Sequence, residues 1–154
     1  MTEPIRNSKR FEDRTILLEK CKKIFFPVVN DVRGKLCFIE GLKHVPFDIK
    51  RVYFIFDVPS DATRGGHVHT ITEQVVVALS GSFDVVLDDG YSQESVMLNR
   101  PYYGLYIPPG VWRSLENFSS NSVALSIVST VFSEQDYVRD HRNFRKLVAE
   151  GHWK

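Results

Sequence analysis

The chain has 154 residues, the length of one ordinary domain, and its 43% hydrophobic and 25% charged residues are the balance of a folded globular protein. Its 20 basic and 19 acidic residues leave a formal net charge of +1, which argues against nucleic acid or a membrane surface as a partner. Cys21 and Cys37 are the only cysteines and form no CxxC pair, as expected in a reducing compartment. No apolar run is long enough for a signal peptide or a transmembrane helix, so we expect a cytoplasmic protein.

Residues 1–23 are expected to form a polar N-terminal leader, and residues 24–150 a single domain. Within this domain, short β-rich segments alternate with Gly, Pro, Asn and Asp at roughly the 8–12-residue spacing of an antiparallel sandwich or barrel. The pattern therefore predicts an all-β fold. The expected strands are 24–29, 35–40, 49–56, 74–79, 82–87, 95–98, 104–107, 112–116 and 123–131.

One helix is expected at the C-terminal end of the domain. Ser133 resembles an N-cap, Asp136 at the third helical position completes a capping box, and Gly151 is a C-terminal stop. We expect this helix to pack on the outside of the barrel or on a dimer partner, and to have no catalytic role. The apolar residues expected on its packed face are Tyr137, Phe144, Leu147 and Val148.

The segment 64–69 reads Arg-Gly-Gly-His-Val-His and contains a pair of histidines two residues apart. Residues two apart on a strand face the same side, so His67 and His69 point together. On the outside of a barrel the two histidines would gain nothing from this pairing. Inside it, they would form a polar pair in a mostly apolar cavity, which is the usual anatomy of a ligand site.

Two motifs around these histidines resemble those of the cupin superfamily, and the resemblance implies a jelly-roll barrel, or double-stranded β-helix. His67 and His69 are followed by Gln74, where the first cupin motif has an acid. The second motif is matched by Pro-Pro-Gly-Val-Trp-Arg at 108–113, with Arg113 in place of a histidine. Because Gln74 and Arg113 occupy two metal-ligand positions, and a guanidinium has no lone pair to offer, we predict that no metal is bound.

Without a metal, paired histidines beside tyrosine and arginine are typical of proton transfer. The unperturbed pKa of histidine, about 6.5, lets it accept and return a proton at neutral pH. Tyr53 lies two residues after Arg51, so both point the same way, although a tyrosine on a strand can equally belong to the core. Arginines suit phosphate or an enolate oxygen, and those that can face the lumen, or else lie at the surface, are Arg33, Arg51, Arg64 and Arg113.

Longer segments resemble the dTDP-sugar 3,4-ketoisomerases of the WxcM-like cupin family. The resemblance covers about residues 24–146, and it departs from the family at Gly66, where an aromatic residue is expected before His67. The segments that carry it include Pro-Phe-Asp-Ile-Lys-Arg-Val-Tyr at 46–53, the histidine segment at 64–69, Gly-Leu-Tyr-Ile at 104–107 and Glu-Gln-Asp-Tyr-Val-Arg at 134–139.

The resemblance implies a homodimeric isomerase that acts on dTDP-4-keto-6-deoxyglucose without metal or cofactor. Such enzymes move the ketone from C4 to C3 and supply an aminotransferase that makes 3-amino-3,6-dideoxy sugars for bacterial surface glycans such as lipopolysaccharide O-antigen. By position, the resemblance implies that His67 and Tyr53 are the acid and base residues, with His69 beside them. The residues expected to contact the substrate are Arg33, Arg51, Arg64, Gln74, Tyr106, Trp112 and Arg113. Of these, Tyr106 and Trp112 either stack on thymine or pack in the barrel wall.

This chemistry is reasonable, because a hydrogen on C3 is acidic when C4 carries a carbonyl. We expect His67 to remove it, and Tyr53 or His69 to move protons between the two oxygens. Two alternatives stay open. A 3,5-epimerase would begin with the same proton abstraction, but such enzymes pair a histidine with an aspartate, and the sequence shows no evident aspartate partner. A non-enzymatic sugar-binding cupin would keep the pocket without needing the histidine–tyrosine pairing.

Overall fold

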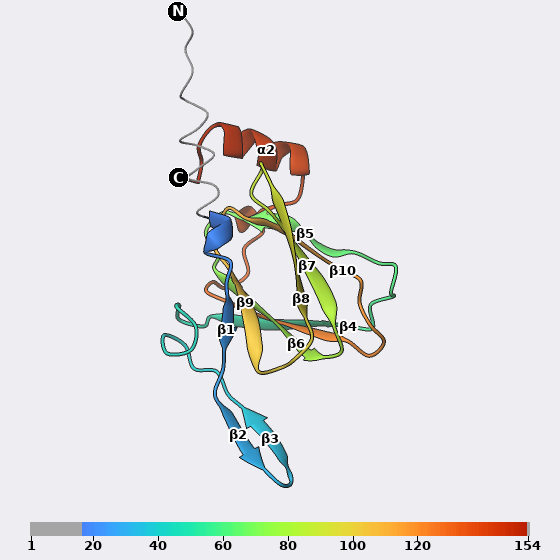
Figure 1. The fold of residues 1–154 in the computed structure, drawn as a ribbon. Coiled ribbons are helices and arrows are strands. Elements are labelled where there is room, and N and C mark those ends of the chain that lie inside the picture. The colour runs from blue at the N-terminus through green and yellow to red at the C-terminus, as the bar shows by residue number, and fades with distance from the viewer. Residues whose placement is uncertain (1–16, 154) are drawn as a thin grey trace, which may run out of the picture.

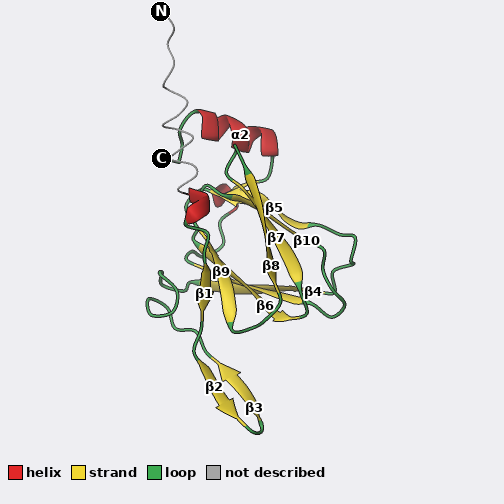
Figure 2. Cartoon of the chain, viewed as in Figure 1, coloured by secondary structure: helices red, strands yellow, loops and turns green. Residues whose placement is uncertain are grey.

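Two antiparallel five-stranded sheets face each other with an apolar core between them (Figure 1). The computed structural model describes residues 17–153. The first sheet has the order β1 (Lys23–Phe25), β9 (Tyr103–Ile107), β6 (Gln74–Ser80), β11 (Val123–Val128), β4 (Arg51–Phe56). The second has the order β12 (Tyr137–Val138), β5 (Arg64–His69), β10 (Trp112–Glu116), β7 (Phe83–Asp88), β8 (Gln93–Leu98). The predicted all-β jelly-roll barrel with a C-terminal helix is confirmed, and Figure 2 shows how little of the chain is helical.

The alternation of side chains along β6 shows how the sequence divides the barrel into layers. Val76 and Ala78 enter the core between the sheets, whereas Val75 and Val77 pack in a second apolar cluster on the outer side. Gln74 shares the inward side with Val76 and is buried at the first position of the strand. The barrel interior is therefore apolar along most of β6 and polar at this one end.

The hairpin formed by β2 (Val28–Asp31) and β3 (Gly34–Cys37) projects beyond the two sheets (Figure 1). A single strand over 24–29 was expected, but the ladder breaks at Phe26 and Pro27. Proline has no N–H to donate to a neighbouring strand, and the Phe26 side chain turns into the second apolar cluster. The break lets the hairpin leave the barrel.

Part of the predicted leader belongs to the barrel. Leu18 is buried in the main core, and β1 begins at Lys23, which pairs with Leu105 of β9. Residues 1–16 of the leader lie outside the described residues.

The C-terminal helix begins later than its sequence predicted. The segment after Ser133 forms only a short 3-10 helix, η1 (Glu134–Asp136), and the Ser133 side chain makes no capping hydrogen bond. Helix α2 (His141–Ala149) is capped instead by Asp140, whose carboxylate accepts hydrogen bonds from two backbone N–H groups of the first turn. The capping box at Ser133 and Asp136 was therefore wrong, because the Asp136 carboxylate has other partners. Among residues 17–153, no helix is long and apolar enough to cross a bilayer.

Candidate active site

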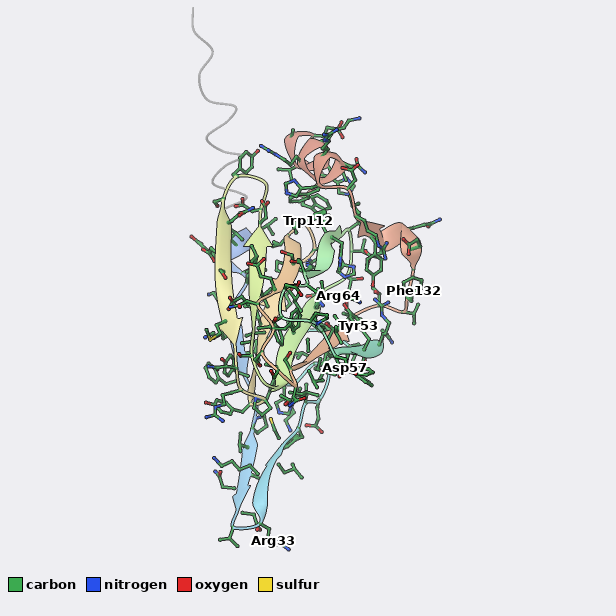
Figure 3. All side chains as sticks on the ribbon, turned by 90° about the vertical axis from the view of Figure 1, so that its right-hand side faces the viewer. Arg33, Tyr53, Asp57, Arg64, Trp112 and Phe132 are labelled. Atoms are coloured by element: carbon green, nitrogen blue, oxygen red, sulfur yellow. The ribbon has the colours of Figure 1, made fainter. Side chains whose placement is uncertain are left out.

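A cavity of about 700 Å³ lies at the polar end of the barrel interior and is lined from both sheets. Figure 3 shows three of its lining residues, Tyr53, Arg64 and Phe132, on one side of the barrel. The first sheet contributes inward-facing residues of β4, β6 and β11, and the second contributes β5 and β10. The polar lining residues are Arg51, Tyr53, Thr63, Arg64, His67, Gln74, Arg113, Ser126, Tyr137 and Arg139.

A chain of three side chains leads from the cavity wall into the protein. His67 lines the cavity, and its Nε2 lies 3.2 Å from Nε2 of His69, which is fully buried. On the far side of that ring, Nδ1 of His69 lies 2.7 Å from a carboxylate oxygen of Asp136. Strand β5 places the two histidines on one face, as predicted, and η1 brings the aspartate to them. The cavity histidine is thus connected through its neighbour to a buried carboxylate.

The Asp136 carboxylate is held by a turn that directly follows β5. Its Oδ1 accepts hydrogen bonds from the Thr70 hydroxyl at 3.0 Å and from the Ile71 backbone N–H at 2.8 Å. Its Oδ2 accepts from the Thr72 hydroxyl as well as from His69. Burial raises the pKa of this carboxyl, but the hydrogen bonds from Thr72 and Ile71 and the neighbouring His69 outweigh it and lower the pKa to about 2. Asp136 is therefore ionised at neutral pH.

Both histidines are neutral at pH 7. Burial first, and then the positive charge of Arg113, lower the pKa of His67 from 6.5 to about 2. The same two causes lower the pKa of His69 to about 3, although the Asp136 carboxylate partly opposes them. Arg113 has this effect because it lies directly across from His67 in the pairing of β10 with β5.

Arg113 is fully buried and belongs to a second polar network. Its Nη1 donates to Oε1 of Gln74 at 2.9 Å, and its Nη2 donates to the Val111 carbonyl at 2.7 Å. The Gln74 amide in turn donates to the Tyr53 hydroxyl at 3.1 Å and to the Ser126 hydroxyl at 2.8 Å. Because Gln74 donates to the Tyr53 oxygen, the phenolic hydrogen is free to point to a ligand in the cavity.

Arg51 has spare hydrogen-bonding capacity in the lining, as does Nε of Arg113. The guanidinium of Arg51 lies 5.4 Å from the ring centre of Tyr53 and 5.5 Å from that of Phe132. Its Nε and Nη2 atoms are buried and have no hydrogen-bond partner among the described residues. Buried N–H groups without partners are costly, so this arrangement favours an oxygen-rich anionic ligand.

The site is unsuited to a metal ion. The positions of two cupin ligands are filled by Gln74 and Arg113, which bond to each other. Across residues 17–153, no group of three or more His, Cys, Asp or Glu side chains is placed to hold a metal. The residues present offer a divalent cation two neutral imidazoles and a neighbouring positive charge, which is a poor donor set.

Most of the residues singled out from the sequence meet at this cavity. Those that line it are Arg51, Tyr53, Arg64, His67, Gln74 and Arg113, and His69 lies directly behind His67.

Tyr106 and Trp112 do not line the cavity, because each lies next to an inward-facing residue on its strand. Leu105 and Ile107 enter the main core, so Tyr106 faces the outer cluster, where its hydroxyl donates to Glu73 at 2.7 Å. Trp112 precedes the inward-facing Arg113 and packs against helix α2. The sequence left two alternatives for Tyr106 and Trp112, stacking on thymine or packing in the barrel wall. In this chain both rings pack in the barrel wall.

Arg33 lies at the tip of the β2–β3 hairpin, far from Tyr53 and Arg64 (Figure 3). Its guanidinium pairs with Asp31 at 2.8 Å, and both side chains are exposed. Within one chain it therefore has no contact with the cavity.

Sequence reasoning missed several residues of the site. Asp136 was assigned to a helix cap, and no local pattern connects it to histidines more than sixty positions earlier. Tyr137 was assigned to the packed face of the expected helix, whereas it lies in β12, which pairs with β5 and sets Tyr137 across from His69. The other missed polar or aromatic residues that line the cavity are Phe54, Thr63, Ser126, Phe132 and Arg139.

Comparison with known proteins decides the family. The protein-family model FdtA, described as "WxcM-like, C-terminal", matches residues 19–149 of this chain. These residues include both sheets and helix α2. The chain belongs to this WxcM-like family. The resemblance found in the sequence is thereby confirmed.

Several proteins similar to this chain are named as sugar isomerases. The TDP-4-oxo-6-deoxy-alpha-D-glucose-3,4-oxoisomerase of Aneurinibacillus thermoaerophilus is 44% identical over 129 residues, which are 84% of this chain and 93% of that protein. A 3,4-ketoisomerase structure from Helicobacter canadensis has 41% identity and a TM-score of 0.81, and covers 83% of this chain and 96% of its own. The sugar 3,4-ketoisomerase QdtA from Thermoanaerobacterium thermosaccharolyticum, solved with TDP, has 38% identity and a TM-score of 0.84, with 86% and 97% covered.

Proposed function

We propose that this chain is a dTDP-sugar 3,4-ketoisomerase that converts dTDP-4-keto-6-deoxyglucose to the corresponding 3-keto sugar. The observation that carries the proposal is the His67–His69–Asp136 chain, which begins at the cavity wall and ends at an ionised carboxylate. Two relatives support this choice of substrate. One is the oxoisomerase from A. thermoaerophilus. The other is a ketoisomerase from T. thermosaccharolyticum, 37% identical to this chain, a mutant of which was solved in complex with TDP-4-keto-6-deoxyglucose.

The reaction moves two hydrogens and changes no overall oxidation state. His67 takes the C3 hydrogen as a proton, and the electrons of the C–H bond form an enediolate across C3 and C4. The histidine returns the proton to C4, while the O3 proton moves to O4 through Tyr53 or a neighbouring group. Arg51 stabilises the enediolate with its unpartnered N–H groups. Each positioned acid or base is typically worth about 10²–10⁴ in rate.

Bound substrate raises the pKa of the catalytic base, His67. The protein groups around His67 lower its pKa to about 2, too low for a base at neutral pH. A sugar nucleotide brings a doubly charged diphosphate, and the enediolate adds another negative charge. Negative charge beside a histidine favours the protonated ring, so both offset the effect of Arg113. The arginines on the lining that are available to hold the diphosphate are Arg51, Arg64 and Arg139.

The same proposal includes a homodimer. On β4 the outward side chains Val52, Phe54 and Phe56 are exposed by 53%, 60% and 57%, although they are apolar. The hairpin also exposes Leu36, by 58%. Exposed apolar faces of this kind mark interaction sites. If the hairpin of one copy packed on β4 of a second copy, the exposed apolar residues of the hairpin and of β4 would cover each other. This packing would also give Arg33 a route to the partner's cavity, where it would contact the substrate as predicted. Sedimentation at equilibrium tests this, and a monomer at micromolar concentration would contradict it.

We place the reaction in the cytoplasm, in the synthesis of 3-amino-3,6-dideoxy sugars for surface glycans. A ketone at C3 is the electrophile that an aminotransferase needs, which is the chemical reason for moving it there.

A 3,5-epimerase is the alternative that a specific observation favours. The absence of an aspartate partner argued against it, and that expectation was wrong, because His69 bonds to Asp136. Against it, the rmlC epimerase of Mycobacterium tuberculosis, at 19% identity and a TM-score of 0.63, shares the fold alone.

Incubation with dTDP-4-keto-6-deoxyglucose in D₂O, followed by NMR of the products, separates the candidates. A 3-keto sugar supports the proposal, and deuterium at C4 would show that the proton on His67 exchanges with solvent before it returns to the sugar. A 4-keto sugar inverted at C3 and C5 would indicate an epimerase, and unchanged sugar that still binds would indicate a binding protein. The His67→Asn variant is the control, and it should lose about 10²–10⁴ in turnover while keeping its affinity for dTDP.

A further inference from the structure

The hydrogen bonds around Asp136 dictate where the protons of both histidines lie. The carboxylate is an acceptor only, so every group bonded to it must donate. Nδ1 of His69 lies 2.7 Å from it and therefore carries a hydrogen. His69 is neutral, so its Nε2 carries none and is an acceptor.

The same reasoning extends to His67. Its Nε2 lies 3.2 Å from the bare Nε2 of His69, and two bare nitrogens at this distance would repel each other. Nε2 of His67 therefore carries the hydrogen and donates it. His67 is also neutral, which leaves Nδ1 as its one basic nitrogen.

We propose that Asp136 is a positioning residue that sets the tautomers of both histidines, so that Nδ1 of His67 is the atom that takes the substrate proton. This rests on the proposed isomerase function. As Nδ1 of His67 takes the C3 proton, its Nε2 hydrogen moves to Nε2 of His69, and the pair of electrons left on the sugar forms the enediolate. The resulting His69 imidazolium lies against the Asp136 carboxylate, and the transfer reverses when C4 is protonated.

The surroundings of Asp136 are suited to this role. His69 is fully buried and Asp136 is 5% exposed, so no solvent competes for their bond. The three donors besides His69 come from the Thr70–Thr72 turn and keep the carboxylate ionised. A backbone N–H, that of Ile71, is among them, and it cannot change from donor to acceptor.

This N–H makes Asp136→Asn a sharp test. The amide oxygen of the new side chain must stay opposite the Ile71 N–H, which turns its NH₂ group toward His69 and Thr72. The Thr72 hydroxyl can accept, because it can donate instead to Thr130 at 2.6 Å. Nδ1 of His69 must then accept as well, so both histidines switch tautomers and the basic nitrogen of His67 turns away from the substrate.

The readout is the position of the ring protons in the full chain, measured by long-range ¹H–¹⁵N NMR of the histidines without ligand. We expect hydrogen on Nδ1 of His69 and on Nε2 of His67 in the wild type, and the reverse in Asp136→Asn. Turnover of the variant should fall by about 10²-fold or more, with dTDP affinity within about threefold. A wild-type His69 protonated on Nε2, or a variant with unchanged tautomers or with turnover within threefold of wild type, would overturn the proposal.

Asp88→Asn is the matched control. Asp88 is another buried aspartate bonded to a histidine, with its Oδ2 3.0 Å from Nε2 of His141, but it lies outside the cavity lining. This variant should keep the His67 and His69 tautomers and the wild-type turnover. The NMR result does not depend on activity. A wild type with these tautomers but without isomerisation would therefore reject the proposed function and leave the assignment of Asp136 standing.

Discussion

Acidification from pH 7 to pH 5 should destabilise the fold strongly, because the two site histidines resist protonation. In the unfolded chain each takes a proton near its ordinary pKa of 6.5, whereas in the folded chain their pKa values are about 2 and about 3. Between these limits the unfolded state binds more protons, so falling pH favours unfolding. Each histidine contributes at most about 1.4 kcal/mol per pH unit, which integrates to about 2 kcal/mol between pH 7 and pH 5. The two together should lower the free energy of unfolding by about 4 kcal/mol. Asp136 has its pKa lowered from 3.8 to about 2, so its own contribution is lost only below about pH 4.

Urea denaturation at pH 7, 6 and 5, followed by circular dichroism, measures this loss. His67→Asn removes one of the two titrating groups and should reduce the loss between pH 7 and pH 5 to about 2 kcal/mol. The comparison is made within each protein, so any constant cost of the substitution cancels. A wild-type loss under about 1 kcal/mol, or the same loss in wild type and variant, would refute the reasoning. Saturating dTDP should reduce the loss of stability on acidification, because bound negative charge raises the pKa of both histidines in the folded state.

Four further outcomes are expected. Arg113→Met should raise the pKa of His67 and His69, because the Arg113 charge is the second cause of their depression, and an NMR titration that shows no rise would contradict this. Gly66→Ala should change the free energy of unfolding by less than about 0.5 kcal/mol, since its Cβ would meet only an indole carbon at 3.7 Å. Gly65→Ala should cost about 1–2 kcal/mol, because Gly65 has a φ of +85°, and equal urea midpoints for the two variants would count against the argument. Turnover should be unchanged after EDTA treatment, whereas a loss reversed by a divalent metal would show that the site holds one.

The sequence predicted the cavity wall well where spacing on a strand decides the direction of a side chain. His67 and His69 on β5, and Arg51 and Tyr53 on β4, each share a face as their two-residue spacing requires. The same rule explains why two alternatives stayed open for Tyr106. Spacing shows which residues share a face but not which face is inside, and only the core around Leu105 settles that.

The missed part of the site depends on contacts between distant segments. Ser133 and Asp136 have the spacing of a capping box, which is a local signal. A local signal cannot show that distant residues will bond the Asp136 carboxylate instead. In the fold, the turn after β5 offers Asp136 three donors besides His69, whereas the acidic residue of a capping box bonds a single backbone N–H at the helix N-terminus. The place of Arg33 at the hairpin tip could not be predicted for a similar reason, because nothing local shows that Phe26 and Pro27 direct the hairpin away from the barrel.

The separation of Asp136 from His69 along the chain has a consequence for the order of folding. The two residues are 67 positions apart, and the strands β6 to β11 lie between them. On the ribosome strands β1 to β11 and both histidines emerge before Asp136, so these strands can pair while His69 still lacks its carboxylate. Long-range contacts of this kind form late because closing a long loop costs entropy. During refolding, recovery of turnover should therefore lag behind recovery of β-sheet structure, and the lag would time the docking of the C-terminal segment.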